Sequence, residues 1–297
     1  MTRMSALPAL WSVQCTRRSL ASPPKLTLVL ILWLICLHPI ASRAQNPAGN
    51  ALTRSSVPPA FHTTGAVPVI TEQAKQIEQG LEERLRTLAN VICSEETERY
   101  ARKGKSTSQV DTLHLNVEVL GGVERYSEIR RNDKIYADMR KVPGTWSTGE
   151  MATLLSATRD AIEAGQIRIA RDETSDLGPS SVMTFSYTAE ERRWYLMTHS
   201  QVHWLPFEGR LWASPDTGEI RRITWLTKDV PDDTGVSQVL WTVNFSPVDL
   251  EPVVVTLPET VLYQVTYKNS ADHMDWNVTR FSGYRRYGSE TAVHFDD

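Results

Sequence analysis

The chain has 297 residues, of which 41% are hydrophobic, with 32 lysines and arginines against 35 aspartates and glutamates. A chain of this length and apolar content can bury a sizeable core within a single domain. Its formal net charge of −3 excludes the basic footprint typical of nucleic-acid-binding proteins and gives no polybasic patch for an anionic membrane.

The first 44 residues follow the three-part plan of a secretory signal peptide. Basic residues come first, the apolar run Leu26–Leu37 follows, and small residues at Ser42 and Ala44 mark a cleavage site. We predict cleavage near Ala44 and export of residues 45–297 to the periplasm of a bacterium or out of the cell. The alternative is a retained membrane anchor, although the run is short for a span that needs about 20 residues.

Removal of this segment leaves 253 residues with 27 basic and 35 acidic side chains, a net charge of −8. Cys93 is then the one remaining cysteine, so the exported chain has no internal disulfide. A nucleophilic or redox role for Cys93 is one interpretation, but a buried small residue at the apolar end of a helix is favoured. Residues 45–69, rich in Pro, Gly and Ser, are predicted to be a disordered linker, and residues 70–297 a single domain.

Helical periodicity opens the domain. From Thr71, which can cap the helix, apolar residues recur every three or four positions: Ile77, Leu81, Leu85, Leu88 and Ile92. From Glu95 the period changes to two, and residues 112–120, 123–130 and 135–139 read as a meander of half-buried strands.

A second helix is predicted between Ser147 and Ala164. Ser147 and Glu150 have the spacing of a capping box, and Gly165 ends the pattern. Its predicted buried stripe contains Met151, Leu154, Leu155, Thr158 and Ile162. The remainder alternates as strands, with clear examples at residues 183–187, 194–198, 239–245, 261–267, 276–281 and 291–295.

The most informative stretch is the predicted hairpin of residues 209–226. Two β-rich runs flank Pro215-Asp216-Thr217-Gly218, where proline presets φ and Gly218 can adopt positive φ. In all, about ten to twelve strands and two main helices are expected, which excludes a doubly wound parallel sheet. The predicted fold class is therefore α+β, with a large antiparallel sheet.

Three short stretches resemble segments of the LolA-like superfamily of outer-membrane lipoprotein sorting, which includes the N-terminal domain of the RseB/MucB regulators. They are the hairpin motif (Gly209, Leu211-Trp212, Thr217-Gly218, Arg221-Arg222-Ile223), Cys93–Tyr100, and the closing Asn277–Phe281 with Tyr284–Gly288. The resemblance implies an unclosed half-barrel that holds the helices against its concave side. It also implies a cell-envelope protein that carries a lipid or contacts another envelope protein.

Few residues have the spacing of a catalytic or metal site. His199 and His203 are four apart, but zinc needs a third ligand, and Ser200 lacks the sharp turn that exposes a hydrolase nucleophile. Asp229, Asp232 and Asp233 lack the ligand spacing of a calcium loop. We predict no metal, no cofactor and no enzymatic activity, and keep an exported hydrolase as a minor alternative.

Tryptophan is the one compositional excess, with seven in residues 45–297. A large core that needs large side chains is the simpler interpretation, and the wall of an apolar cavity is the other. The predicted cavity residues are Trp194, Trp212, Trp225, Trp241, Phe245 and Leu155. The functional hypothesis is an exported binding protein for a lipid acyl chain or another apolar group, and the alternative is a protein-interaction or envelope-stress-sensing module.

Overall fold

The computed structural model describes residues 72–88, 90–164, 168–198, 201–227, 229–268 and 272–286, together with strand β1 (Val13–Cys15). These residues belong to one compact unit, formed by Met1–Arg17 and Ala66–Asp297; a second unit, Arg18–Gly65, lies outside the described residues. The predicted cleavage site, linker and last strand (residues 291–295) also lie outside them.

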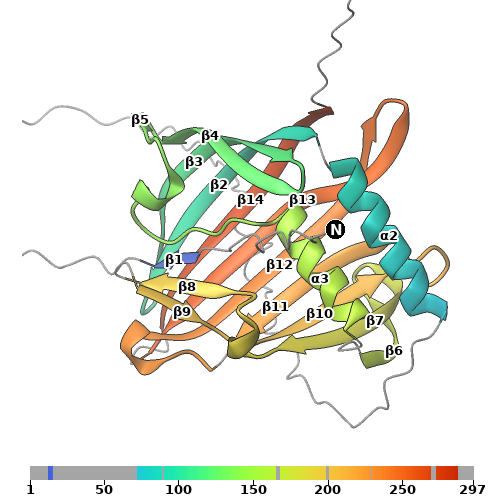
Figure 1. Cartoon of the computed structure of the whole chain (residues 1–297). Helices are drawn as coiled ribbons and strands as arrows, with labels where there is room; N and C mark the ends of the chain where they lie inside the picture. The colour runs from blue at the N-terminus through green and yellow to red at the C-terminus, as the bar shows by residue number, and fades with distance from the viewer. Residues whose placement is uncertain are drawn as a thin grey trace, which may run out of the picture. The chain divides into compact units, whose positions relative to one another are not determined.

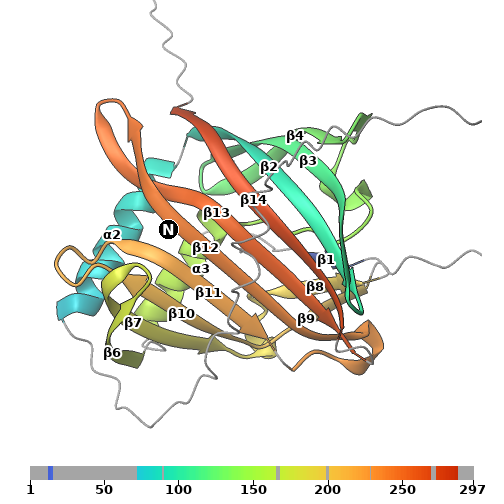
Figure 2. The ribbon, with the colours of Figure 1, turned by 180° about the vertical axis from the view of Figure 1, so that it is seen from behind.

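The described residues form an antiparallel sheet of 11 strands in the order β5-β4-β3-β2-β14-β13-β12-β11-β10-β7-β6 (Figures 1 and 2). The strands are β2 (Val91–Lys103), β3 (Ser106–Leu120), β4 (Val123–Arg131), β5 (Lys134–Ile135), β6 (Arg168–Ser175), β7 (Gly178–Tyr187), β10 (Phe207–Ala213), β11 (Ile220–Thr227), β12 (Val236–Leu250), β13 (Val253–Tyr267) and β14 (His273–Arg286). Because the edge strands β5 and β6 do not pair with each other, the sheet is an open half-barrel, which confirms the predicted fold class.

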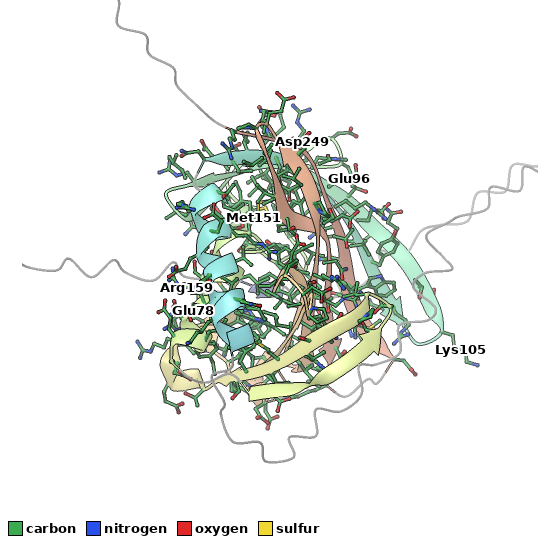
Figure 3. The ribbon with its side chains drawn as sticks, turned by 90° about the vertical axis from the view of Figure 1, so that its right-hand side faces the viewer. Glu78, Glu96, Lys105, Met151, Arg159 and Asp249 are labelled. Atoms are coloured by element: carbon green, nitrogen blue, oxygen red, sulfur yellow. The ribbon has the colours of Figure 1, made fainter. Side chains whose placement is uncertain are left out.

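Two α-helices of the described ranges, α2 (Glu72–Leu88) and α3 (Ala152–Glu163), lie on one side of this sheet and contact each other (Figure 1). In the side view of Figure 3, Arg159 of α3 lies on the helix side and Glu96 of β2 on the opposite side. Single-turn 3₁₀ helices occur at Met139–Lys141 (η1), Ala189–Glu191 (η2) and Asp232–Thr234 (η3). A small sheet consists of β8 (Tyr195–Thr198), β9 (Gln201–Trp204) and β1, which pairs in parallel with β8.

Alternation along the strands separates the two faces of the large sheet. On β3, Leu113, Leu115 and Val117 are buried in the core, while His114 and Asn116 face outward. The period of two therefore supplies a continuous apolar inner face, which the helices cover with their own apolar stripes.

The first helix ends earlier than its apolar pattern predicts. The interpretation that the helical stripe continues to Ile92 is wrong, because Asn90 has a φ of 145° and β2 begins at Val91. Val91 and Ile92 pair with β3, and their β-branched side chains suit a pleated strand. Cys93 is consequently a strand residue rather than a helix-end residue, and its thiol is free and buried.

The start of the second helix also differs from the prediction. Ser147 Oγ donates to Glu150 Oε1 at 2.7 Å, but α3 begins only at Ala152, so this pair does not form a capping box for it. The amides of residues 151–153 donate instead to Glu124 Oε1 of β4, at 3.2, 2.9 and 3.1 Å. A carboxylate from the sheet thus caps the helix.

The predicted hairpin between β10 and β11 is confirmed. Ser214 N donates to Glu219 O at 2.8 Å across the turn, and Gly218 has a φ of +69°. A Cβ at Gly218 would lie 3.2 Å from the Cβ of Gln76 on α2. The turn therefore needs glycine both for its backbone conformation and for its close approach to the helix.

Candidate functional site in the interior between sheet and helices

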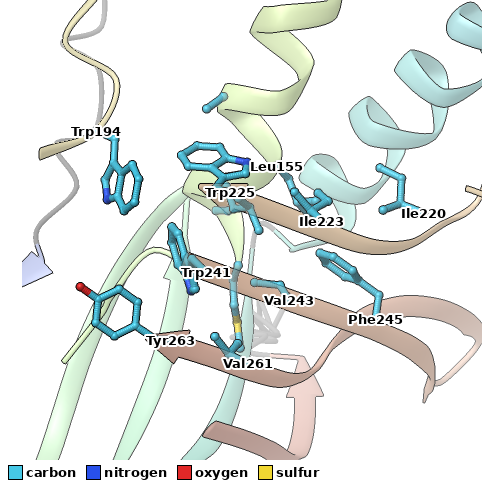
Figure 4. Packing of buried hydrophobic residues seen from close by; sticks show 14 of the residues in the cluster. Leu155, Trp194, Ile220, Ile223, Trp225, Trp241, Val243, Phe245, Val261 and Tyr263 are labelled. Atoms are coloured by element: carbon cyan, nitrogen blue, oxygen red, sulfur yellow. The ribbon is translucent and has the colours of Figure 1, made fainter. Parts of the chain in front are cut away.

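An aromatic cluster occupies one half of the interior. Neighbouring strands supply Phe207 (β10), Trp225 (β11) and Trp241 (β12), and the two tryptophans are cross-strand partners. The rings of Phe207 and Trp225 are stacked with centroids 4.0 Å apart. Trp194 approaches from outside the large sheet, with centroids 5.9 Å from Trp225 and 6.3 Å from Trp241 (Figure 4).

Gly209 makes this packing possible. It pairs with Phe185 of β7 on one side and with Trp225 on the other. A Cβ at Gly209 would lie 2.2 Å from the Phe185 ring, which itself packs edge-on against Trp225 at 6.2 Å. The first residue of the hairpin motif therefore provides space for an aromatic ring.

Trp194 precedes β8, and its position is fixed by a backbone hydrogen bond to Leu205 and by an ion pair of the neighbouring Arg193. Its carbonyl accepts from Leu205 N at 3.0 Å, and the adjacent Arg193 Nη1 donates to Asp160 Oδ2 of α3 at 2.6 Å. Although Trp194 is fully buried, its indole Nε1 has no hydrogen-bond partner within the described structure. A buried donor without a partner costs free energy, about 1–3 kcal/mol.

Five of the six predicted cavity residues belong to one buried cluster: Leu155, Trp194, Trp225, Trp241 and Phe245. Trp212 does not belong to it. Trp212 pairs with Arg222 on the other face of the sheet, where the guanidinium groups of Arg210 and Arg222 lie 5.0 and 5.9 Å from its ring centroid. These side chains are packed against one another, so their binding of a ligand stays a prediction.

An acidic group of residues occupies the other half of the interior. It comprises Glu95 on β2, Glu124 on β4 and Glu150 just before α3, and the residues Glu95 and Glu150 are 6% and 3% exposed. Tyr126 OH donates to Glu124 Oε2 at 2.6 Å and accepts from Gly149 N at 2.8 Å. The first turn of α3 is therefore held to β4 by polar contacts to Glu124 and Tyr126.

Burial shifts the titration of this acidic group. It raises the pKa of Glu95 to about 7, against the opposing effect of the hydrogen bond from Thr97. Burial, followed by the charges of Glu95 and Glu124, raises the pKa of Glu150 well above its ordinary value. Burial also raises the pKa of the Cys93 thiol, which disfavours the thiolate that a nucleophilic role requires.

These glutamates were not among the site residues predicted from the sequence. The alternation of side chains along β2 would nevertheless have indicated one of them. On β2 the inward positions include Cys93, Glu95, Thr97 and Arg99, so polar side chains occupy the buried face of this strand. Extending the period of two back to Val91 would have placed Glu95 in the interior.

A buried ion network begins at Arg99, which shares the inward face of β2 with Glu95. Arg99 Nη2 donates to Asp111 Oδ2 at 2.7 Å, and Arg131 Nε donates to the same oxygen at 2.6 Å. Arg99 Nη1 also donates to Pro143 O at 2.8 Å. The network therefore ties the segment that leads into α3 to strands β2, β3 and β4.

The structure does not add support for a catalytic or metal site at the other histidine, serine and aspartate candidates. His199 and Ser200 lie outside the described residues, and His203 Nε2 is 3.0 Å from Thr198 Oγ1. Asp232 forms an ion pair with Lys268 at 2.6 Å. Within the described ranges, no group of three or more histidine, cysteine or acidic side chains is arranged to hold a metal ion.

No protein-family model and no curated protein matches the chain. Among solved structures, a DUF1329 family protein from Desulfovibrio piger ATCC 29098 is similar with a TM-score of 0.36 and 11% identity, over 75% of this chain and 96% of that chain. MucB, solved in complex with MucA(peri), aligns with a TM-score of 0.18 and 12% identity, over 73% of this chain and 100% of that chain. Neither likeness identifies a ligand or a partner for this chain.

The class that the strands and helices define is an α+β protein with an open antiparallel half-barrel and helices against one face. This is the architecture expected from the LolA-like resemblance, and membership of that superfamily stays a prediction. In the part of the chain that is described, no helix is both long and apolar enough to cross a membrane.

Proposed function

We propose that the chain is an exported, non-enzymatic binding protein of the bacterial cell envelope that holds a lipid acyl chain or another apolar group in its aromatic interior. The observation that supports this most is that Trp194 belongs to a segment outside the large sheet. The large sheet supplies Phe207, Trp225 and Trp241, whereas Trp194 comes from the segment before the separate β8–β9 hairpin.

Trp194 occupies the place that a ligand would take. Moving this segment outward would expose an aromatic surface on three adjacent strands, and an apolar chain could replace the indole there. Part of the cost of this movement is offset because the unpaired indole N–H would gain a hydrogen bond to water. Export to the periplasm rests on the signal-peptide plan of residues 1–44.

The first test is native mass spectrometry of residues 45–297 purified from a bacterial periplasm, followed by denaturing extraction. We expect an additional bound mass of lipid size that is released on denaturation. In addition, Trp194→Ala should open space in the cluster and strengthen binding of an apolar fluorescent probe such as N-phenylnaphthylamine. Trp204→Ala on β9, where the indole packs on Tyr195, is the matched control.

A clean apo mass, together with equal probe binding by Trp194→Ala and Trp204→Ala, would contradict the apolar-ligand proposal. It would favour the second candidate, a protein-interaction module.

One feature of the surface favours that second candidate. Residues 245–258 of β12 and β13 pair only with each other and extend past β11 and β14. Val253 and Val254 at the tip of this ribbon are 42% and 69% exposed. Prolines at positions 247 and 258 remove edge donors, which disfavours strand addition and leaves the apolar tip as the contact.

A pull-down from envelope extracts tests this second candidate. Wild-type protein should recover a stoichiometric partner that Val254→Asp loses, while Val202→Asp, at another exposed valine, retains it. Equal recovery by both variants, or no partner at all, would count against a contact at the ribbon tip.

A further inference from the structure

The start of α3 is attached to the sheet through acidic side chains. Glu124 of β4 accepts three amide hydrogen bonds from residues 151–153, and Ser147 bonds to Glu150 directly before the helix. Glu95 is buried on the inward face of β2, two residues from Cys93, whose pairing runs through Val117 of β3 to Tyr126 of β4. Carboxyl groups from β2, β4 and the residue before α3 therefore lie on the inner side of the sheet, at the junction where α3 begins.

The donors at this junction can neutralise only part of its charge. Glu124 receives amide hydrogen bonds from α3 and the hydroxyl of Tyr126, but burial outweighs these bonds and raises the pKa of Glu124 as well. The side-chain donors of Glu95 and Glu150 are the neutral hydroxyls of Thr97 at 2.9 Å and Ser147 at 2.7 Å. Among the described residues, neither carboxyl group has an ion pair with a lysine or arginine. A buried carboxyl group in such surroundings favours the protonated form.

We propose that Glu95 and Glu150 act as a proton-dependent latch, which holds the start of α3 against β2 and β4 when they are protonated and releases it when they ionise beside Glu124. The latch is a property of the junction and does not depend on whether the aromatic interior binds a ligand.

The other titratable side chains around the junction do not change their charge in the pH range in which the latch would act. β2 contributes Cys93, β4 contributes Tyr126 and β14 contributes Tyr284, and burial raises the pKa of each, so all three stay neutral in the relevant range. Two cations lie on the neighbouring strands: Arg285 of β14, which acts on Cys93, and Arg99 of β2, whose guanidinium is paired with Asp111. The inward residues of β3 beside the junction are apolar.

The direction of the pH effect follows from the raised pKa values. A carboxyl group whose native pKa lies above its unfolded value contributes stability that is fully present below the unfolded pKa and is lost as pH rises through the native pKa. For Glu95 this range extends from its ordinary value of 4.5 to about 7. Glu150 contributes in the same direction, because its pKa is also raised well above 4.5.

Release of the latch would affect the cover of the interior. α3 contributes Leu155 to the aromatic cluster, and its Ala157 carbonyl accepts from Tyr187 OH at 2.7 Å. Loosening the first turn therefore weakens the attachment of α3 to the sheet and makes the interior more accessible at higher pH.

Hydrogen exchange followed by mass spectrometry tests the latch on the mature chain without ligand. After correction for intrinsic exchange, protection of peptides that cover residues 149–157 should fall by about tenfold or more between pH 5.5 and pH 8. Glu95→Gln and Glu150→Gln should each reduce this dependence, because the amide stays neutral. Glu82→Gln, at an exposed position of α2, should leave it unchanged.

Protection that is independent of pH in the wild-type chain, or full pH dependence in both glutamine variants, would overturn the latch. If the variants do not fold, ¹³C spectra of carboxyl-labelled glutamates in the wild-type chain decide the question. Titration of every glutamate below pH 5 would then refute it, and two that titrate above pH 6 would support it. Neither result bears on lipid binding, so the two proposals fail separately.

Discussion

Gly209 shows how a single missing side chain shapes the aromatic interior. Its backbone lies where any Cβ would collide with the Phe185 ring, and that ring supports Trp225. The glycine has no special φ, so the requirement is for space rather than for backbone freedom. The same position opens the hairpin motif on which the LolA-like resemblance rests.

Gly209→Ala should lower the free energy of unfolding by about 1–3 kcal/mol, because Phe185 must leave its position in a packed core. Urea denaturation followed by tryptophan fluorescence measures the change. Gly80→Ala is the control, since nothing lies within 4 Å of a Cβ there and the helix α2 should gain about 0.5–1 kcal/mol. Equal effects of the two substitutions would contradict the steric argument.

At the scale of elements, the segment between η1 and α3 depends on polar contacts to the sheet. Besides the Arg99 contact to Pro143, Asn277 Nδ2 of β14 donates to Thr145 O at 2.9 Å. Thr145 Oγ1 donates to Asp275 Oδ2 at 2.9 Å. The segment thus crosses the inner face of β2 and β14 and delivers α3 to its place over the sheet.

Asp111→Ala should lower the free energy of unfolding by about 3–5 kcal/mol at neutral pH, because Arg99 would lose its partner in the interior. Arg99 and Asp111 have side chains that are 4% and 0% exposed. Thermal denaturation and urea titration measure the loss. Asp138→Ala removes the exposed pair with Arg140 and should have a much smaller effect.

The same variant has a defined pH signature. Burial alone would raise the pKa of Asp111, but the hydrogen bonds from Arg99 and Arg131 bring it below its ordinary value of 3.8. Its contribution is present above that value and is lost as pH falls through the native pKa. The difference between wild type and Asp111→Ala should therefore shrink in acid, and a difference that grows in acid would refute this assignment.

At the scale of the whole molecule, the large sheet is built entirely from residues that follow position 90. Strand β1 contributes three paired residues to the small sheet and falls inside the predicted signal peptide. The β8–β9 hairpin has its own antiparallel pairing, so it does not need β1 to form.

Residues 45–297 should therefore fold as an independent chain with a cooperative thermal transition and the far-ultraviolet circular dichroism of an antiparallel β-rich protein. Circular dichroism and calorimetry of this chain test the expectation. A non-cooperative transition, or exposure of hydrophobic surface to a dye, would show that residues 1–44 are needed for the fold and would contradict signal cleavage near Ala44.

The sequence predicted those parts of the fold that depend on local periodicity. The alternation on β3, the β10–β11 turn at Gly218 and the apolar stripes of both helices all follow from backbone geometry and side-chain type. The ends of the helices did not follow, because α2 ends at Leu88 rather than continuing to Ile92, and α3 is capped by Glu124, a residue of a distant strand. A cap supplied from the sheet leaves no signal at the helix itself.

The sequence by itself determined the sheet-rich class, the two helices and the aromatic character of the interior, since these depend on period and composition. Only the tertiary structure decided that Trp212 lies apart from Trp225, that Glu124 caps α3, and that Glu95 and Glu150 are buried. The physical reason is that strand register assigns each side chain to a face, and that the environment of a carboxyl group is set by whatever the fold packs around it.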